Sequence, residues 1–200
     1  MCIRDSCKPS CAWNRKASVS APVKTCQKDG ISVLTDPNAA NACGGGSSYV
    51  CTNTAPWAIN DQLAYGWAAA HLTGKSESDW CCACYQLTFT STAIAGKQMI
   101  VQVINTGGDL GNNHFDLQIP GGGVGLNNAC TSQWGAPSNG WGQQYGGVSS
   151  IDQCNQLPSQ LRSGCQFRFQ WFQGVDNPNM NFQEVACPAV LTSISGCKRN

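Results

Sequence analysis

The chain has 200 residues, of which only 12% are charged, and its formal net charge is +1. This length fits one domain with an adequate core, and the low, balanced charge predicts no nucleic-acid partner. No apolar run approaches the roughly 20 residues of a membrane-spanning helix, so no membrane partner is expected.

The cysteine content indicates the compartment. Fourteen cysteines against two histidines are typical of disulfides and an oxidising environment. Because the chain opens without the apolar core of a secretory signal peptide, we interpret it as the mature or truncated form of a secreted protein. The cluster Cys81-Cys82-Ala83-Cys84 lacks the paired knuckles or nearby histidines of a zinc site, so disulfides, no metal and no cofactor are expected.

In chain order, the first element is a cysteine-rich arm from Cys7 to Trp13, with a proline-fixed turn. Residues 14–56 show little periodicity and many turn residues, so Cys26, Cys43 and Cys51 are expected to hold this segment through disulfides.

The next segment predicts the main helix. Pro56 would open it, with Thr54 as N-cap, and it would end near Gly74. Its apolar residues recur at helical spacing at Trp57, Leu63, Ala64, Trp67, Ala68 and Leu72.

After Trp80 the pattern changes to alternation. It predicts a hairpin of strands over 85–89 and 99–103 with a turn at Gly96-Lys97, and further strands over 167–172 and 182–187. Residues 149–162 are expected to hold short helices broken at Pro158. Several strands, one main helix and long loops together predict a mostly β domain in the form of a closed barrel.

The glycine-flanked stretch Asn105–Gly125 carries the candidate chemistry. It holds Asp109, His114 and Asp116 between a double and a triple glycine, where the backbone must bend or approach something closely. Alternation over 114–119 predicts a half-buried strand that faces the core through Phe115, Leu117 and Ile119 and leaves His114, Asp116 and Gln118 on its open face. A turn acid satisfied by backbone amides is the commoner role of a single aspartate.

Other chemistries find no support in the sequence. It has no phosphate-binding P-loop, no Gly-x-Ser-x-Gly elbow and no recognisable protease cysteine. What remains is carboxylate chemistry beside exposed aromatic and amide side chains, a combination that suits neutral polyols such as sugars.

Three motifs resemble glycoside hydrolase family 45. They are the arm Cys7 to Trp13, the run Trp80 to Phe89, and the stretch from Gly107-Gly108-Asp109 through His114-Phe115-Asp116 to Gly125. The resemblance covers nearly the whole chain from Cys7 onward. It implies a single catalytic domain over residues 1–200, with a six-stranded double-psi β-barrel, long disulfide-stapled loops and a few short helices. It also implies a secreted, monomeric endo-β-1,4-glucanase that acts on cellulose or other β-glucans with inversion of anomeric configuration.

The resemblance also implies roles for individual residues. Asp116 matches the general acid, Asp5 the general base, and Asp109 an assisting acid on a mobile loop. An inverting enzyme needs one protonated carboxyl and one carboxylate that holds a water, roughly 6.5–9.5 Å apart. The candidate substrate-binding residues are Trp13, which matches a sugar-stacking position, together with Lys8, His114 and Tyr145; for His114 a purely structural hydrogen bond is an equal alternative.

The first six residues depart from the family pattern, and a cloning or assembly artefact would explain them. Ile3, Arg4 and Ser6 stand where the family has tyrosine, tryptophan and cysteine, and only Asp5 is retained. The family pairing implies the bridges Cys7–Cys43, Cys11–Cys81, Cys26–Cys51, Cys82–Cys197, Cys84–Cys187 and Cys154–Cys165. Because Ser6 replaces its usual partner, Cys130 is expected to be free or only partly bridged to Cys2.

Two other classes share the barrel. Expansin-like proteins keep an equivalent of the acid but lack the base and the Cys-Lys-Pro-Ser-Cys arm, and they carry a second domain for which 200 residues leave no room. A barwin-like lectin is disfavoured by the joint presence of Asp109 and Asp116.

Overall fold

The computed structural model describes residues 7–200; residues 1–6, which include Asp5, Cys2 and Ser6, lie outside the described residues. The strands are β1 (Thr25–Cys26), β2 (Val33–Leu34), β3 (Trp57–Ala58), β4 (Leu63–His71), β5 (Cys84–Phe89), β6 (Gln98–Thr106), β7 (His114–Leu117) and β8 (Met180–Val185). The helices are α1 (Glu77–Trp80), α2 (Cys130–Trp134), α3 (Ser159–Gln170) and α4 (Ala189–Ser195), with 3₁₀ turns η1 (Ser10–Ala12), η2 (Ala42–Gly44) and η3 (Ile151–Gln156). No helix within residues 7–200 is long and apolar enough to cross a membrane.

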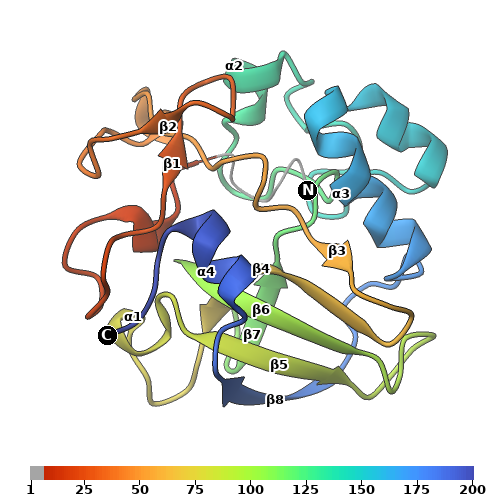
Figure 1. The fold of residues 1–200 in the computed structure, drawn as a ribbon. Coiled ribbons are helices and arrows are strands. Elements are labelled where there is room, and N and C mark those ends of the chain that lie inside the picture. Colours follow the sequence, from red (N-terminus) through yellow and green to blue (C-terminus); the bar gives the residue numbers. More distant parts are fainter. Residues whose placement is uncertain (1–6) are drawn as a thin grey trace.

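One sheet organises the molecule (Figure 1). Its strands run in the order β3-β4-β6-β5-β8. The sixth strand, β7, pairs with residues 68–71 of β4, after the residues of β4 that pair with β3. The β4–β6 pair is parallel and the others are antiparallel. The predicted hairpin is confirmed as β5–β6, and the strand predicted over 182–187 is confirmed as β8. A mostly β fold is therefore confirmed. Within residues 7–200, β3 and β8 do not pair, so closure of a barrel stays a prediction.

The helix predicted from Pro56 to Gly74 is wrong, because this segment forms β3 and β4. Strand β4 has paired strands along its edges, and none of its residues is exposed, so both of its faces are largely covered. A strand covered on both faces reads as a continuous apolar run, in which helical spacing is met by chance. Thr54 caps no helix; it is buried, and its hydroxyl and carbonyl oxygens accept hydrogen bonds from the Gln118 side chain.

The strand predicted over 167–172 is also wrong. These residues complete α3 and the turn after it, and α3 begins directly after Pro158, where the expected break lies. The helix packs between two apolar clusters: Phe167, Trp171 and Phe172 join the main core, whereas Leu161 and Cys165 belong to a second cluster that Phe169 flanks. Because the helix is buried on two sides, its aromatic residues recur at a spacing of two, which is typical of a strand.

Disulfides hold the loops around this sheet. All six bridges implied by the resemblance are present: Cys7–Cys43, Cys11–Cys81, Cys26–Cys51, Cys82–Cys197, Cys84–Cys187 and Cys154–Cys165. Those from Cys82 and Cys84 span 115 and 103 residues, and loops of this length constrain the unfolded chain by roughly 4–5 kcal/mol each. Cys130 is disulfide-bonded, so the prediction that it is free is wrong; the call on Cys2 lies outside the described residues.

Candidate active site

Asp116 lies on β7, the short strand that pairs with β4. In the strand register Asp116 faces Ala69 of β4, and Ala69 faces Asn105 of β6, beside an irregularity between Ala68 and Ala69. Neighbours in register share a face of a sheet, so the small Ala69 leaves a hollow between the two polar side chains. The strand places its acid beside an open space, as the alternation predicts.

The neighbours of Asp116 agree with the predicted alternation, with one exception. Phe115 and Ile119 are buried, Leu117 is half-buried, and His114 is exposed. Gln118, however, is buried because β7 ends at Leu117 and the chain turns inward toward Thr54. Gln118 lines the same cavity as Asp116, as its place in the alternation predicts, but it is not exposed.

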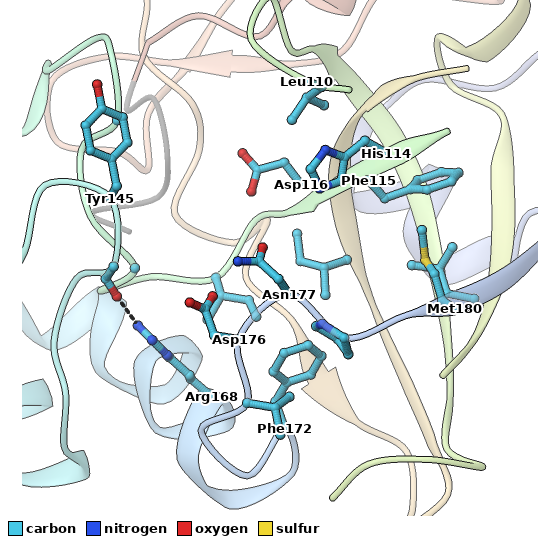
Figure 2. Close-up of a pocket in the computed structure, with 18 of the residues that line it drawn as sticks. Leu110, His114, Phe115, Asp116, Tyr145, Arg168, Phe172, Asp176, Asn177 and Met180 are labelled. Atoms are coloured by element: carbon cyan, nitrogen blue, oxygen red, sulfur yellow. Dashed lines mark hydrogen bonds between the residues drawn. The ribbon is translucent and has the colours of Figure 1, made fainter. Parts of the chain in front are cut away.

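Two cavities meet at the acidic pair. One, of about 300 Å³, runs past Tyr145, Arg168 and Asp176, and the other, of about 120 Å³, runs past Asn105 and Thr106. Asp109 and Asp116 line both cavities, so they stand at the junction of one elongated cleft. Figure 2 shows Asp116 reaching into this space, with Tyr145 on the far wall.

The loop that carries Asp109 is fastened to the sheet by both histidines. The Gly111 N–H donates to His114 Nδ1 at 3.3 Å, and the Gly111 carbonyl lies 3.3 Å from His71 Nδ1. His71 and His114 are directly opposed across β4 and β7. His114 thus makes a structural hydrogen bond at the rim of the cleft, next to the acid.

The N-terminal arm docks at the other end of the cleft. The Ser10 N–H donates to Asn105 Oδ1 at 2.8 Å, and the Ser10 hydroxyl donates to Thr106 Oγ1 at 3.2 Å. The Cys11–Cys81 bridge fixes the same turn from behind. Asn105 and Thr106 line the cleft, so the arm is held against its wall. Asp5, which precedes this arm in the chain, lies outside the described residues.

The carboxylate of Glu77 holds Thr106 in place for its contact with Ser10. Thr106 Oγ1 donates to Glu77 at 2.9 Å while accepting from Trp80 Nε1 at 3.1 Å, and Lys16 pairs with Glu77 at 2.5 Å. Burial raises the pKa of Glu77, but hydrogen bonds from Lys16, Ser10 and Thr106, with the Lys16 charge, outweigh it, so the pKa is lowered overall.

This network predicts a pH dependence of stability. A carboxyl whose folded pKa is lowered contributes stability above its unfolded pKa, near 4.5, and loses it as the pH falls through the folded value. We expect Glu77→Gln to lower the melting temperature at pH 6 and to reduce the further loss between pH 5 and pH 3. Differential scanning calorimetry would check this, with Glu184→Gln as the matched control because the Lys75–Glu184 pair is exposed. Equal acid-induced losses in Glu77→Gln and the parent would contradict the assignment.

Lys8 and Trp13 lie in the arm and line neither cavity. The Lys8 side chain is 4% exposed, and its ammonium donates to the Pro37 and Ala39 carbonyls at 2.5 and 2.9 Å, 3.2 Å from the centre of the Trp13 ring. Burial lowers the pKa of Lys8, which Asp36 partly offsets. These contacts give Lys8 a structural role, and its predicted contact with substrate stays a prediction; Trp13 is half-buried and keeps an open part.

The wall opposite Asp116 holds side chains that the sequence did not single out. Arg168 on α3 donates to the Gly146 carbonyl at 2.6 Å and so fixes the loop that presents Tyr145, which is 64% exposed (Figure 2). Burial lowers the pKa of Arg168, and the carboxylate of Asp176 partly offsets this. Asp176 and Asn177 also line the cleft. Their one signal in the sequence is an Asp-Asn-Pro turn, which alone predicts no site.

Comparisons with known proteins agree with this geometry. The sequence profile of glycosyl hydrolase family 45 matches residues 2–198. The chain belongs to this family. The chain is 58% identical to an endoglucanase of Cryptopygus antarcticus, covering 98% of this chain and 86% of that protein. It is 55% identical to a putative endoglucanase type K of Fusarium oxysporum, of which it spans 52%.

A solved structure agrees with the fold. The crystal structure of a cellulase from the Antarctic springtail Cryptopygus antarcticus superimposes with a TM-score of 0.94 at 58% sequence identity. The match covers 98% of this chain and 93% of that one. The family resemblance of the three motifs is confirmed, and with it the chain is a glycoside hydrolase of the cellulase type.

Proposed function

We propose that this protein is a secreted endo-β-1,4-glucanase that cleaves internal bonds of cellulose and related β-glucans with inversion at the anomeric carbon. The observation that carries the proposal is the pair Asp109 and Asp116 at the junction of an elongated cleft. A cleft that extends on both sides of the acids accommodates a chain at its interior bonds. Relatives named endoglucanase and cellulase support the same substrate class.

The chemistry divides between two faces of the sugar. Asp116 would donate its proton to the glycosidic oxygen as the bond from C1 to that oxygen breaks. Asp5 would take a proton from a water whose oxygen forms the new bond to C1 from the opposite face. The role of Asp5 rests on the family resemblance, and the docked arm supports it, because Ser10 is fixed to Asn105 across the hollow from Asp116. Asp109 would assist from its loop.

The walls of the cleft suit a neutral sugar chain. The largely exposed Tyr145 provides an aromatic face, and Asn177 and Gln144 offer amide groups beside it. Aromatic faces cover the apolar side of a pyranose, while amides bind its hydroxyls. We include Tyr145, His114 and Trp13 as sugar contacts and leave out Lys8, whose ammonium is bound by backbone carbonyls.

The proposed enzyme has four further properties. Residues 1–200 form a single catalytic domain, which the nearly full-length family match supports. Its strands close into a six-stranded double-psi barrel, for which the parallel β4–β6 pair and the β7 branch are suitable elements. The protein acts as a monomer, and it works outside the cell, where its disulfides are stable.

The expansin-like alternative gains no specific support. The test is a comparison of viscosity loss with reducing-end release on a soluble cellulose derivative. An endoglucanase lowers viscosity early, because each internal cut halves a long chain on average. Loss of viscosity or wall stiffness without new reducing ends would favour the non-hydrolytic alternative and overturn the proposal.

The stereochemistry gives a separate prediction. Attack by a water that Asp5 holds opposite Asp116 produces the α-anomer first from a β-glucan. Proton NMR of the anomeric signals in the first minutes of cello-oligosaccharide hydrolysis would detect it before mutarotation. An initial β-anomer would indicate a covalent intermediate and contradict the assignment of the base.

A further inference from the structure

A second groove lies on the other side of α3 from the cleft. Its volume is about 560 Å³, and its lining includes Asn53, Trp57, Ser163, Gln170 and Trp171. It shares no lining residue with the cleft: Arg168 and Phe172 face the acidic pair, whereas Phe167 and Trp171 face this groove. Figure 1 shows α3 beside β3, the two elements between which it runs.

One face of α3 forms the first wall. Gln160, Ser163, Phe167 and Gln170 recur every three or four residues, so they lie along one side of the helix. Gly164 lets this helix approach the opposite wall: a Cβ there would come within 2.9 Å of Ala55 Cβ and 2.6 Å of Pro120 Cγ. The two walls are therefore held at a fixed separation by close backbone packing.

The groove contains a rigid aromatic surface. The half-buried ring of Trp57 packs against Tyr65 and Trp67, with ring centres 5.7 Å apart in both pairs. The Trp171 indole N–H donates to the Asn60 carbonyl at 2.8 Å, which fixes a second, buried tryptophan in the lining. Aromatic rings held in this way lose little conformational entropy when a ligand packs on them.

The polar groups of the groove are available to a ligand. The side chains of Asn53, Ser163 and Gln170 are exposed, and none hydrogen-bonds to another group within residues 7–200. The lining that the structure describes carries no charged side chain. A fixed indole surrounded by neutral amides and a hydroxyl matches a pyranose, which offers an apolar face and a rim of hydroxyls, and does not match an anion or a cation.

We propose that this groove is a second binding site for a β-glucan chain, separate from the cleft and without catalytic activity. The inference rests on the proposed function for the identity of the sugar. No carboxylate belongs to its described lining, so a bound chain would be held without being cut. The groove would raise the local concentration of polymer and would not affect substrates short enough to occupy the cleft alone.

Affinity electrophoresis in gels with neutral hydroxyethyl cellulose tests the proposal, with Asp116→Asn as the background so that the polymer is not cut. Two variants change the groove: Trp57→Ala removes its aromatic surface, and Ser163→Arg inserts a long charged side chain from an exposed position. Each is expected to weaken retention of the protein about tenfold, the loss typical of removing one central contact. In the parent with Asp116 intact, both are expected to hydrolyse cellotetraose within about twofold of the unchanged rate.

Ser193→Arg is the matched control, since Ser193 is an exposed serine on α4 that does not line the groove. Melting curves check folding, and Ser163→Arg decides the outcome if Trp57→Ala melts early. Unchanged retention in Ser163→Arg would overturn the second site. The two proposals can also fail separately. If the parent hydrolyses no cello-oligosaccharide, the proposed function is wrong. If retention is still lost with Ser163→Arg and not with Ser193→Arg, the groove remains supported.

Discussion

Asp116→Asn is expected to lower kcat on cello-oligosaccharides by at least about 10²–10⁴-fold, the range for loss of a general acid. The amide has nearly the shape of the carboxyl, and the residue sits on a strand fixed by β4, so the fold should remain intact. In the proposed mechanism, the substitution removes only the proton that the leaving oxygen would receive. Initial rates with cellopentaose and a melting curve on the same preparation measure the two effects.

A matched control separates the role of this acid from a general loss of charge. Asp152, on η3, is an exposed aspartate that does not line the cleft. Asp152→Asn is expected to keep the parent's rate within about twofold. A substrate whose leaving group needs no protonation, such as a dinitrophenyl cellobioside, should recover much of the activity lost in Asp116→Asn. Parent-like hydrolysis of unactivated oligosaccharides by Asp116→Asn would remove it from the role of acid.

Local pattern predicted the elements that have a clear turn or an alternating run. The β5–β6 hairpin has both, a turn at Gly96-Lys97 and alternating burial over most of β5, so its strands could be placed from the sequence. Strand β4 and helix α3 could not, since each is covered on two sides and carries apolar residues at both helical and strand spacing. Partners distant in sequence decide the structure there, and the local sequence does not contain that information.

The candidate site divides in the same way. Asp116 and Asp109 could be found because a glycine-flanked strand and a family motif mark them in one short stretch. Arg168 and Asp176 reach the cleft from a helix and a turn that lie 52 and 60 residues after Asp116, so their approach depends on the tertiary fold. Lys8 shows the converse: it lies in a matching motif, yet packing directs its ammonium to backbone carbonyls.

The triple glycine Gly121-Gly122-Gly123 packs closely against the loop that carries Tyr145, and this packing explains why glycine is needed there. Gly147 has φ of +69°, and its N–H and carbonyl both bond to Gln143, which closes the loop that carries Tyr145. The Val148 N–H donates to the Gly121 carbonyl at 2.8 Å, which joins the two segments directly. A Cβ on Gly147 would overlap the Gly121 carbonyl oxygen and the backbone of Gly122. On the other side, a Cβ on Gly123 would lie 2.4 Å from the Gln144 carbonyl oxygen, so the close approach requires glycine in both segments.

Gly147→Ala is consequently expected to destabilise the protein by more than about 3 kcal/mol, which lowers the melting temperature by roughly 6–12 °C in a chain of this size. Gly74→Ala is the matched control: Gly74 has φ of +73°, but a Cβ there meets nothing within 4 Å. Left-handed strain alone costs about 1–2 kcal/mol, so the difference between the two variants measures the backbone overlap. Calorimetry of both variants, with disulfides intact, gives that difference. Activity should fall more in Gly147→Ala than in Gly74→Ala, because relief of the overlap displaces the wall that presents Tyr145. Equal losses of stability in the two variants would show that the loop moves away at no cost and that the packing against the triple glycine does not hold the cleft wall.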